Sequence, residues 1–358
     1  MTRSLIQRHP FFIRLFNWEY WPAQAIYIPM LFYFLWLLIR GRQPQYFTAA
    51  NPGIYFGGMG VESKYETLQK IPEKLRPVSV LVKAGDSFDQ TLQKLHTAGI
   101  GFPLFAKPDI GFRGLLVKRI ATAAELEAYL SRFPLDFIVQ GLIDYPMEVG
   151  VLYYRMPDEK QGTVSSLTLK EFLHVTGDGV STVLELVKNK PRALLQLDRL
   201  RDTHAAVLDT VPQAGQHVSL GAVGNHSKGT RFIDGCHLIT PELCAHFDRL
   251  SHQMEGIYYG RFDLKCQSLG DLVTGEHLKV IELNGVCAEP THIYDPKHSF
   301  FYGLRQTARH WRILTLISTQ TRRNGFVPPT PRTTIKAIFS LRPYAARIKA
   351  LAQAEGKP

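Results

Sequence analysis

Two short segments alternate polar and apolar side chains, and their polar members are of the types that bind metal ions and phosphates. They read Gly-Arg-Phe-Asp-Leu-Lys at 260–265 and Lys-Val-Ile-Glu-Leu-Asn-Gly at 279–285. Alternation is the period of a half-buried strand, so Arg261 and Asp263 share one face. Glu282 and Asn284 share a face for the same reason. If the strands pair in antiparallel fashion across a polar turn at 270–275, these two faces coincide.

Two carboxylates and an amide oxygen on one face are hard ligands of the kind that suits Mg²⁺. A bland surface hairpin with solvated charges is the alternative. Together the two segments resemble the metal-binding end of the ATP-grasp superfamily, carboxylate-amine ligase type, which includes D-alanine:D-alanine ligase, glutathione synthetase and the ATP-grasp domain of cyanophycin synthetase. The resemblance implies that Asp263, Glu282 and Asn284 bind Mg²⁺, with Mn²⁺ as a possible substitute. It implies that Arg261 is catalytic and stabilises the transferring group.

The resemblance also implies the fold. The expected class is α/β (α+β) with ATP-grasp architecture, in which the nucleotide is held between two α/β subdomains. We expect four parts along the chain: a basic, aromatic N-terminal membrane-associating segment at 1–42, an N-terminal α/β subdomain at 43–100, an ATP-grasp nucleotide-binding and catalytic region at 101–304, and a basic C-terminal helical tail at 305–358. A length of 358 residues is sufficient for two or three packed subdomains.

A loop that contains glycines follows a lysine at the end of an apolar strand. The segment at 104–114 reads Leu-Phe-Ala-Lys-Pro-Asp-Ile-Gly-Phe-Arg-Gly. Gly111 and Gly114 would let the loop close over phosphates because they carry no Cβ. The segment resembles the ATP-grasp motif in which a lysine contacts the nucleotide phosphates beneath a flexible lid. The resemblance implies that Lys107 is a catalytic, phosphate-binding residue and that Arg113 adds a second cation.

Two strand-forming stretches follow each other between 137 and 152. They resemble the superfamily element in which a hinge pairs its backbone with adenine and a nearby glutamate reaches the ribose. The resemblance implies that Gln140, Gly141 and Leu142 form the hinge and that Glu148 is the ribose ligand. The superfamily more often has glutamate at the position of Gln140, so only the backbone role carries over there.

Two more stretches, at 170–187 and 218–230, are similar to parts of cyanophycin synthetase and related peptide ligases. The similarity implies that Lys170 faces the nucleotide and that Asn225 and Lys228 contact phosphate or substrate. A histidine in a loop is more often structural than a base, so we assign no proton transfer to His226.

The glycine cluster that begins at Gly57 and precedes Ser63 and Lys64 fits two interpretations. Backbone amides at a helix start can bind a phosphate. The same residues can equally form a turn whose serine caps the following helix. The sequence leaves both open. Glu289 and the residues up to His292 follow the second metal-binding strand and are candidates to face an acceptor pocket.

The positive charge lies at the two ends of the chain. Of the net charge of +11, residues 1–42 contribute +4 and residues 305–358 contribute +10, which leaves −3 for the body. This distribution argues against a nucleic-acid groove across the fold and favours flanks that meet an anionic membrane surface. Solvated tails are the alternative. The four cysteines show no paired spacing, which favours a reducing compartment.

The stretch from Trp21 to Ile39 has no charged residue. Its length is borderline for a bilayer span, while its prolines and aromatic residues favour the membrane interface. We expect a membrane anchor, spanning or re-entrant, through residues 18–42; a buried core helix is the alternative. A signal peptide fits poorly, because arginines follow where small residues would mark cleavage. The tail at 335–352 is basic and amphipathic, and either lies on a membrane or docks on the body.

These observations predict an ATP-dependent carboxylate-amine ligase that forms an amide through an acyl phosphate and requires Mg²⁺. Its partners would be a small-molecule carboxylate and amine, and its location the cytoplasmic face of the plasma membrane, where ATP is available. The alternatives are an ATP-grasp-like kinase and a catalytically inactive nucleotide-binding protein. The metal and phosphate residues would serve a kinase equally well. The identity of the substrates is not encoded in a recognisable motif.

Overall fold

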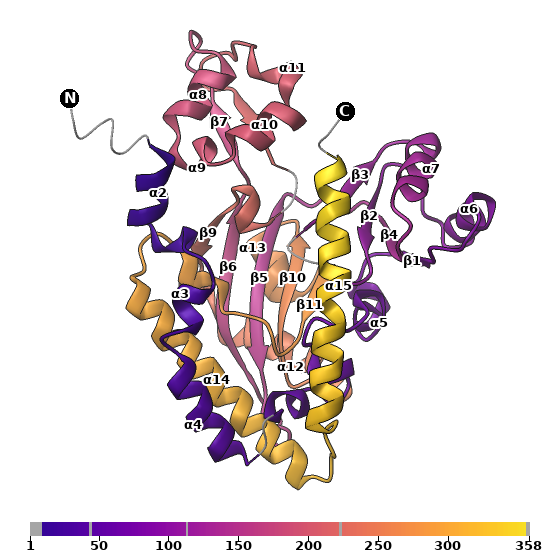
Figure 1. Ribbon diagram of the computed structural model, residues 1–358, viewed down its shortest axis with the longest axis vertical. Coiled ribbons are helices and arrows are strands. Elements are labelled where there is room, and N and C mark those ends of the chain that lie inside the picture. Colours follow the sequence, from indigo (N-terminus) through magenta and orange to yellow (C-terminus); the bar gives the residue numbers. More distant parts are fainter. Residues whose placement is uncertain (1–8, 43–44, 112–113, 222–223, 356–358) are drawn as a thin grey trace.

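The computed structural model describes residues 9–42, 45–111, 114–221 and 224–355. They form a mixed α/β fold around two large antiparallel sheets (Figure 1). The four-stranded sheet has the order β1 (Ser79–Val82), β4 (Phe137–Gly141), β2 (Leu104–Pro108), β3 (Lys118–Ile120). The five-stranded sheet has the order β11 (Leu278–Asn284), β10 (Tyr259–Cys266), β5 (Met147–Tyr154), β6 (Thr163–Glu171), β9 (Arg231–Asp234). The α/β class predicted from the sequence is confirmed.

The two sheets are joined in the chain by residues 142–146, between β4 and β5. The four-stranded sheet combines β1, which belongs to the expected N-terminal subdomain, with three strands of the expected catalytic region. Strands from both sides of the expected boundary at residue 100 therefore belong to one sheet. The division into four domains stays a prediction.

The five-stranded sheet buries one face against α12 (Pro241–His252). Alternate residues of neighbouring strands point to that face, among them Val151, Phe262 and Leu264, and they pack with Phe247 of the helix. None of these four side chains is more than 1% exposed. Because side chains alternate along a strand, the residues between them point the other way, toward the cleft between the two sheets.

Helices α6 (Phe88–Thr97) and α7 (Ala123–Arg132) cover the four-stranded sheet. The C-terminal helix α15 (Pro331–Glu355) also joins this core through Ile348, which is fully buried. The guanidinium of Arg347 donates to the carbonyl of Pro134 over 2.9 Å. Residues 344–352 of the tail therefore dock on the body, which is one of the two interpretations that the sequence left open.

A small lobe stands at one end of the molecule (Figure 1). It contains the hairpin of β7 (His174–Thr176) and β8 (His217–Ser219) and four short helices. These helices are α8 (Val183–Asn189), α9 (Pro191–Leu194), α10 (Leu197–Thr203) and α11 (Ala205–Leu208). The first of them begins at a reciprocal capping pair of Thr182 and Glu185.

The N-terminal segment folds against the body as several short elements. They are α2 (Pro10–Phe16), η1 (Trp18–Tyr20), α3 (Gln24–Tyr27) and α4 (Leu31–Gly41). Helix α4 runs beside α14 (Phe300–Arg323) along one edge of the molecule (Figure 1). Leu37 of α4 is 2% exposed and packs with Ile313 and Ile317 of α14.

The expectation of a membrane-spanning segment over residues 21–39 is not supported. Within the parts of the chain that the structure describes, no helix combines the length and the apolar character needed to cross a membrane. The apolar stretch is divided between α3 and α4, and α4 has 11 residues. At about 1.5 Å per residue this helix reaches roughly half the thickness of a hydrocarbon core.

Short helices connect the larger elements: η2 (Tyr46–Ala50), η3 (Tyr55–Gly57), α5 (Lys64–Gln69), η4 (Glu73–Leu75), η5 (His226–Lys228), η6 (Cys236–Leu238), α13 (Leu269–Thr274) and η7 (Thr291–Tyr294). The polar turn expected at 270–275 is thus a short helix. Ser268 caps its N-terminus, because the side chain of Ser268 accepts a hydrogen bond from the Asp271 amide. A helix forms there because a capped first turn satisfies backbone groups that an open turn would leave to water.

Candidate active site

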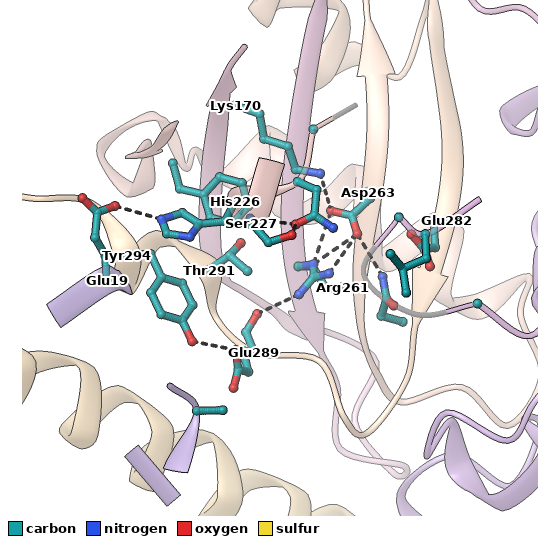
Figure 2. A pocket seen from close by; sticks show the side chains of 18 of the residues that line it. Glu19, Lys170, His226, Ser227, Arg261, Asp263, Glu282, Glu289, Thr291 and Tyr294 are labelled. Carbon is teal, nitrogen blue, oxygen red and sulfur yellow. Dashed lines mark hydrogen bonds and ion pairs between the residues drawn. The ribbon is translucent and has the colours of Figure 1, made fainter. Parts of the chain in front are cut away.

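A cavity of about 460 Å³ lies in the cleft between the two large sheets. Figure 2 shows a part of the side chains that line it. The full lining comes from both sheets, from the loop at 224–227 and from the N-terminal segment. Among the residues predicted from the sequence, the lining contains Lys107, Gly111, Gly114, Glu148, Lys170, Asn225, Arg261, Asp263, Glu282 and Asn284. The fold therefore brings most of the predicted site residues to one place, although their roles stay predictions.

Asp263 is the centre of the site. It lies opposite Glu282 in the antiparallel β10–β11 ladder, as the alternating pattern predicts. Its side chain is 6% exposed and accepts hydrogen bonds from Arg261, at 3.0 Å, and from the amide nitrogen of Asn284, at 2.9 Å. Burial alone would raise the pKa of Asp263. The Arg261 and Lys170 cations outweigh that effect and hold this pKa well below its ordinary value.

Lys170 bridges two acidic side chains at the centre of the five-stranded sheet. Its Nζ donates to Glu148 Oε1 at 2.8 Å and to Asp263 Oδ1 at 2.9 Å. Glu148 lies opposite Lys170 in the β5–β6 ladder, and both side chains are less than 10% exposed. Burial opposes the charge on Lys170, but the two carboxylates more than compensate and raise its pKa. The ammonium is therefore charged, as phosphate binding requires.

Glu282 receives a cation from outside its own sheet. Lys64, at the start of α5, pairs with its carboxylate. Burial raises the pKa of Glu282, but the charges of Lys64 and Lys107 and the hydrogen bond from Lys64 together outweigh this effect, and the net shift is downward. The side chain of Ser63 accepts a hydrogen bond from the Glu66 amide, so the capping interpretation of the Gly57–Lys64 loop describes its last residues. The sequence did not predict that Lys64 reaches the metal-binding strand.

Lys107 crosses the cleft from β2 and donates to the carbonyl of Ile281 at 2.8 Å. Burial lowers the pKa of Lys107 to about 8, and the Glu282 carboxylate offsets only part of this shift. This lysine differs from Lys170 because it makes no ion pair within 4 Å among the described residues. An anion in the cavity would supply the missing charge.

The predicted metal ligands can be tested against the contacts that they make. Asp263 and Glu282 are carboxylates on one face of neighbouring strands, and each is neutralised by cations of the chain. The amide of Asn284 adjoins Asp263. Two ionised carboxylates, one buried and one partly buried, together with an amide oxygen, form a donor set that fits Mg²⁺. The ammonium of Lys64 lies where a bound cation would compete with it.

The hinge residues lie elsewhere. Gln140 is 5% exposed and pairs with Ser79 and Phe105 inside the four-stranded sheet. Neither it nor Gly141 nor Leu142 lines the cavity as the structure describes it. Gln140 and Gly141 are the last two residues of β4, and Leu142 begins the link between the sheets. Their role as a hinge and their contact with adenine stay predictions. Arg113 lies outside the described residues.

The loop before β9 holds its predicted residues in structural contacts. The side chain of Asn225 accepts from the Ser227 amide at 2.9 Å. Lys228 Nζ donates to the carbonyl of Gly114 at 2.7 Å and so ties this loop to the glycine-rich loop. His226 lies 2.8 Å from Glu19, which agrees with the structural role that the sequence favours.

Several lining residues were missed because they carry no motif. Residues 18–26 form one wall, although their apolar character indicated a membrane segment. Glu19 is the only acidic residue among the first 42. It is 8% exposed and pairs with Arg192 at 2.6 Å (Figure 2 shows its contact with His226). A lone carboxylate in a basic, apolar stretch is the one sequence signal that could have indicated a buried partner.

A second, smaller cavity of about 120 Å³ adjoins the first. Arg261, Asn284 and Lys64 line both. Glu62 lines only the smaller one, where burial raises the pKa of its carboxyl. Close packing shapes this wall: Gly58 has φ +87°, and a Cβ there would lie 2.6 Å from the Cα of Gly285.

No protein-family profile matches the chain, and no curated protein sequence is similar to it. Among solved structures, it is similar to a bifunctional glutathione synthetase from Pasteurella multocida, with 19% identity and a TM-score of 0.38, over 70% of this chain and 35% of that one. It is also similar to VanG D-Ala:D-Ser ligase from Enterococcus faecalis, with 14% identity and a TM-score of 0.40, over 71% and 61%. A D-alanine–D-alanine ligase from Bacillus anthracis gives 13% identity and a TM-score of 0.38, over 73% and 67%.

The chain thus spans about a third of the glutathione synthetase and less than two thirds of the D-Ala:D-Ser ligase. Glutathione synthetase and D-alanine–D-alanine ligase are also enzymes that the sequence motifs resemble.

Proposed function

We propose that this protein is an ATP-dependent carboxylate-amine ligase that requires Mg²⁺ and acts through an acyl phosphate. One observation carries the proposal: three cationic side chains pair with two ionised carboxylates in the cleft between the sheets, and a fourth, Lys107, lines the same cavity. The cations are Lys64, Lys107, Lys170 and Arg261, and the carboxylates are Asp263 and Glu282. Phosphoryl transfer depends mostly on positioning and on neutralising charge, and this set of groups can do both.

The chemistry needs two displacements. A carboxylate oxygen attacks the γ-phosphorus of ATP, and the bond to the bridging oxygen breaks, with its electron pair leaving on ADP. An amine nitrogen then attacks the acyl carbon, phosphate leaves with the electron pair of the C–O bond, and the nitrogen loses a proton. Lys107 and Lys170 would hold phosphate oxygens, and Arg261 would stabilise the oxyanion that develops at the acyl carbon.

Asp263, Glu282 and Asn284 would hold Mg²⁺, for which Mn²⁺ is a substitute. The ion would neutralise the β- and γ-phosphate oxygens. Lys64 must release Glu282 for this to happen, and the released ammonium would remain at the boundary between the two cavities. The chain thus holds a cation of its own at the predicted metal site.

The second cavity favours a ligase over a kinase. A kinase needs room for the nucleotide and for one acceptor, whereas a ligase must also admit an amine after the first displacement. The small cavity opens beside Arg261 and contains the carboxyl of Glu62. A raised pKa, caused by burial, suits a carboxylate that accepts the proton lost by the amine nitrogen as it attacks the acyl carbon.

The test uses hydroxylamine as the amine, because it converts an acyl phosphate to a hydroxamate whatever the natural amine is. The purified full-length protein, Mg·ATP and a panel of carboxylates should release ADP and form hydroxamate in equal amounts. Asp263→Asn should abolish both. ADP release with phosphorylated acceptor and no hydroxamate would establish the kinase alternative. A rise in Tm with Mg·ATP without any release of ADP would establish the inactive nucleotide-binding alternative.

We further propose that the protein works at the cytoplasmic face of a membrane, lying on the surface. The outward face of α4 supports this proposal: Leu31, Phe32, Leu35, Trp36 and Ile39 are between 45% and 82% exposed. Such a patch of large apolar side chains is unusual on a protein surface that faces only water.

The neighbouring helix supplies the charge that an anionic lipid surface would attract. Arg305, Arg309 and Arg312 are exposed on α14, with Phe301 and Leu316 at the two ends of the same helical face. An apolar stripe next to arginines is the pattern of a helix that lies in the plane of a membrane. The occupant that fits is a bilayer with anionic headgroups.

A further inference from the structure

The cavity of the active site has an apolar end that the proposed nucleotide chemistry does not use. Its wall is made by the N-terminal segment, with aromatic side chains from three other elements. The lining there contains Trp18, Trp21, Pro22, Ala23, Ala25, Ile26, Phe232, Tyr294 and Phe300. Glu19 is the one charged residue of that segment in the wall, and its carboxylate is paired with Arg192 and His226. The wall therefore presents mainly hydrocarbon and aromatic surface to the cavity.

Specific contacts hold this wall in place. Trp18 donates its ring N–H to the carbonyl of His298 at 2.7 Å, and its ring lies 5.4 Å from that of Tyr294 and 5.9 Å from that of Phe300. Burial alone would raise the pKa of Glu19, but the hydrogen bond to His226 and the charge of Arg192 outweigh it and keep this pKa below the ordinary value. The apolar end is thus a built part of the fold, because its wall is fixed by hydrogen bonds, ring contacts and a buried ion pair.

Glu289 connects the apolar end to the reacting centre. Its carboxylate accepts hydrogen bonds from Tyr27, in the N-terminal segment, and from Tyr294, the latter at 2.9 Å. Its carbonyl accepts from Arg261 at 3.4 Å (Figure 2). Arg261 lines the same cavity as the apolar wall, so a ligand whose hydrocarbon part lies along that wall can present a carboxylate to this cation.

We propose that the carboxylate substrate is an amphiphile, whose hydrocarbon part lies along the wall formed by residues 18–26 and whose carboxylate meets Arg261. This inference rests on the proposed ligase function and names the substrate class for the same site. Ligand cavities are lined mostly by apolar surface, with a few polar groups that fix orientation, and this cavity separates the two kinds of surface at its two ends. A small hydrophilic acid would leave the apolar end to water.

The N-terminal segment offers a route for such a substrate. Ile26 of α3 is 5% exposed and lines the cavity, while Ile28, two residues later, is 68% exposed on the outer surface. The segment is thus the wall of the cavity on one side and part of the exposed apolar surface on the other. An amphiphile dissolved in a lipid surface would meet this element first.

The experiment measures the rise in Tm of the full-length protein with a straight-chain series from acetate through hexanoate, octanoate and decanoate to dodecanoate. Each is added below its micelle concentration, with Mg²⁺ and a non-hydrolysable ATP analogue present at saturation. Affinity follows from the concentration dependence of Tm. We expect it to increase by up to about fourfold for each added methylene until the apolar end is filled. Equal affinity for acetate and dodecanoate would overturn the proposal.

Two variants change the size of the apolar end in opposite directions. Ala25→Phe fills it and should remove the gain with chain length. Trp21→Ala enlarges it, so the affinity should continue to increase up to a longer chain length. Ile28→Ala, on the outer surface, is the matched control and should behave as the unmodified protein does. The same gain in Ala25→Phe as in the control would show that the chains bind elsewhere.

The nucleotide readout separates this inference from the proposed function. A rise in Tm with the Mg·ATP analogue, together with no dependence on chain length, sinks the amphiphile and leaves the ligase. A dependence on chain length without any effect of the nucleotide sinks the ligase and leaves an apolar binding site. Each variant is scored with the nucleotide first, so that a failure to fold is recognised.

Discussion

Asp263 and Glu282 face each other directly across the β10–β11 ladder, yet each is neutralised by a different lysine. Lys170, from the same sheet, pairs with Asp263, whereas Lys64 reaches Glu282 from the start of α5. Two carboxylates this close would repel each other without those cations. The site is therefore charge-balanced within the chain, and its two halves are expected to respond differently to substitution.

Asp263→Asn removes the carboxylate and keeps the shape of the side chain. Arg261 and Lys170 would then be left buried without their shared partner. Loss of one member of a buried pair typically costs about 3–5 kcal/mol of unfolding free energy. Urea denaturation should show a loss of that order, and Asp198→Asn, whose side chain is fully exposed, should show none.

The same residue gives the stability an acid dependence. Because the pKa of Asp263 is lower in the folded state, its contribution is present above the unfolded pKa and disappears as pH falls through the folded value. Asp263→Asn should therefore flatten the loss of stability in acid. In the Asp263→Asn background, Arg261→Met should recover part of the loss, because Asp263 is the carboxylate that pairs with Arg261 and its removal leaves that cation unpaired. Additive losses would show that the two residues are not coupled.

Lys64→Met tests whether the chain's own cation competes with the metal. Without the ammonium, the Glu282 carboxylate keeps no hydrogen-bond partner among the residues that the structure describes, so the metal-free protein should lose about 1–3 kcal/mol of stability. Mg²⁺ with the ATP analogue should restore this stability. The Mg²⁺ concentration that gives half of the gain in stability should be severalfold lower than in the unmodified protein. Lys70→Met, on the exposed side of the end of α5, is the control. A higher Mg²⁺ requirement would instead make Lys64 a phosphate ligand.

Much of this site was predictable because strand alternation fixes which side chains share a face. The pairing of β10 with β11 follows from two matching periods, and it places Asp263 beside Glu282 and Asn284. Lys170 was predicted only to face the nucleotide, yet the register of β6 against β5 puts it on Glu148. Local pattern therefore yields the members of the site, and tertiary register decides their partners.

The remainder depends on contacts that no local pattern encodes. Lys64 and Glu282 are separated by 218 positions in the chain, and nothing near either residue signals the other. The N-terminal segment has the composition of a membrane anchor, but the buried pair of Glu19 and Arg192 fastens it to the body, and its short helices wall the cavity. Composition could not distinguish an apolar wall from an apolar anchor, because both are built from apolar side chains that are removed from water.

Lys107 should give nucleotide binding a characteristic pH dependence. Its pKa of about 8 means that the empty site loses this charge as pH rises through 8, and binding of a phosphate should restore the proton. Affinity for the Mg·ATP analogue should therefore fall above pH 8, with net proton uptake measured by calorimetry in buffers of different ionisation enthalpy. Lys107→Arg should flatten this profile, because a guanidinium stays charged throughout.

Stability should change in the opposite direction over the same window. The unfolded chain binds this proton up to its ordinary pKa of 10.5 and the folded chain only up to about 8, so the unfolding free energy should rise with pH between the two values. Lys107→Met should remove this rise and weaken nucleotide binding at every pH. Binding that is independent of pH in the unmodified protein would place Lys107 outside the phosphate contacts.

Phe32→Ser combined with Ile39→Ser tests the surface of α4. These side chains are 82% and 76% exposed, so their replacement should not cost stability, but it should greatly weaken sedimentation with anionic lipid vesicles. Val180→Ser combined with Val327→Ser is the matched control, since both valines are more than 80% exposed on other parts of the surface. The control should sediment as the unmodified protein does.

The arginines of α14 should set the lipid preference. Arg309→Gln and Arg312→Gln should each lower the affinity for anionic vesicles by about fivefold, since one basic residue near such a surface contributes about 1 kcal/mol. Added salt should shrink the difference, because it screens the headgroup charge. Neutral vesicles should bind weakly and should not distinguish these variants from the unmodified protein. Equal binding to neutral and anionic vesicles would leave only the apolar face of α4 as the source of membrane affinity and would remove the role of α14.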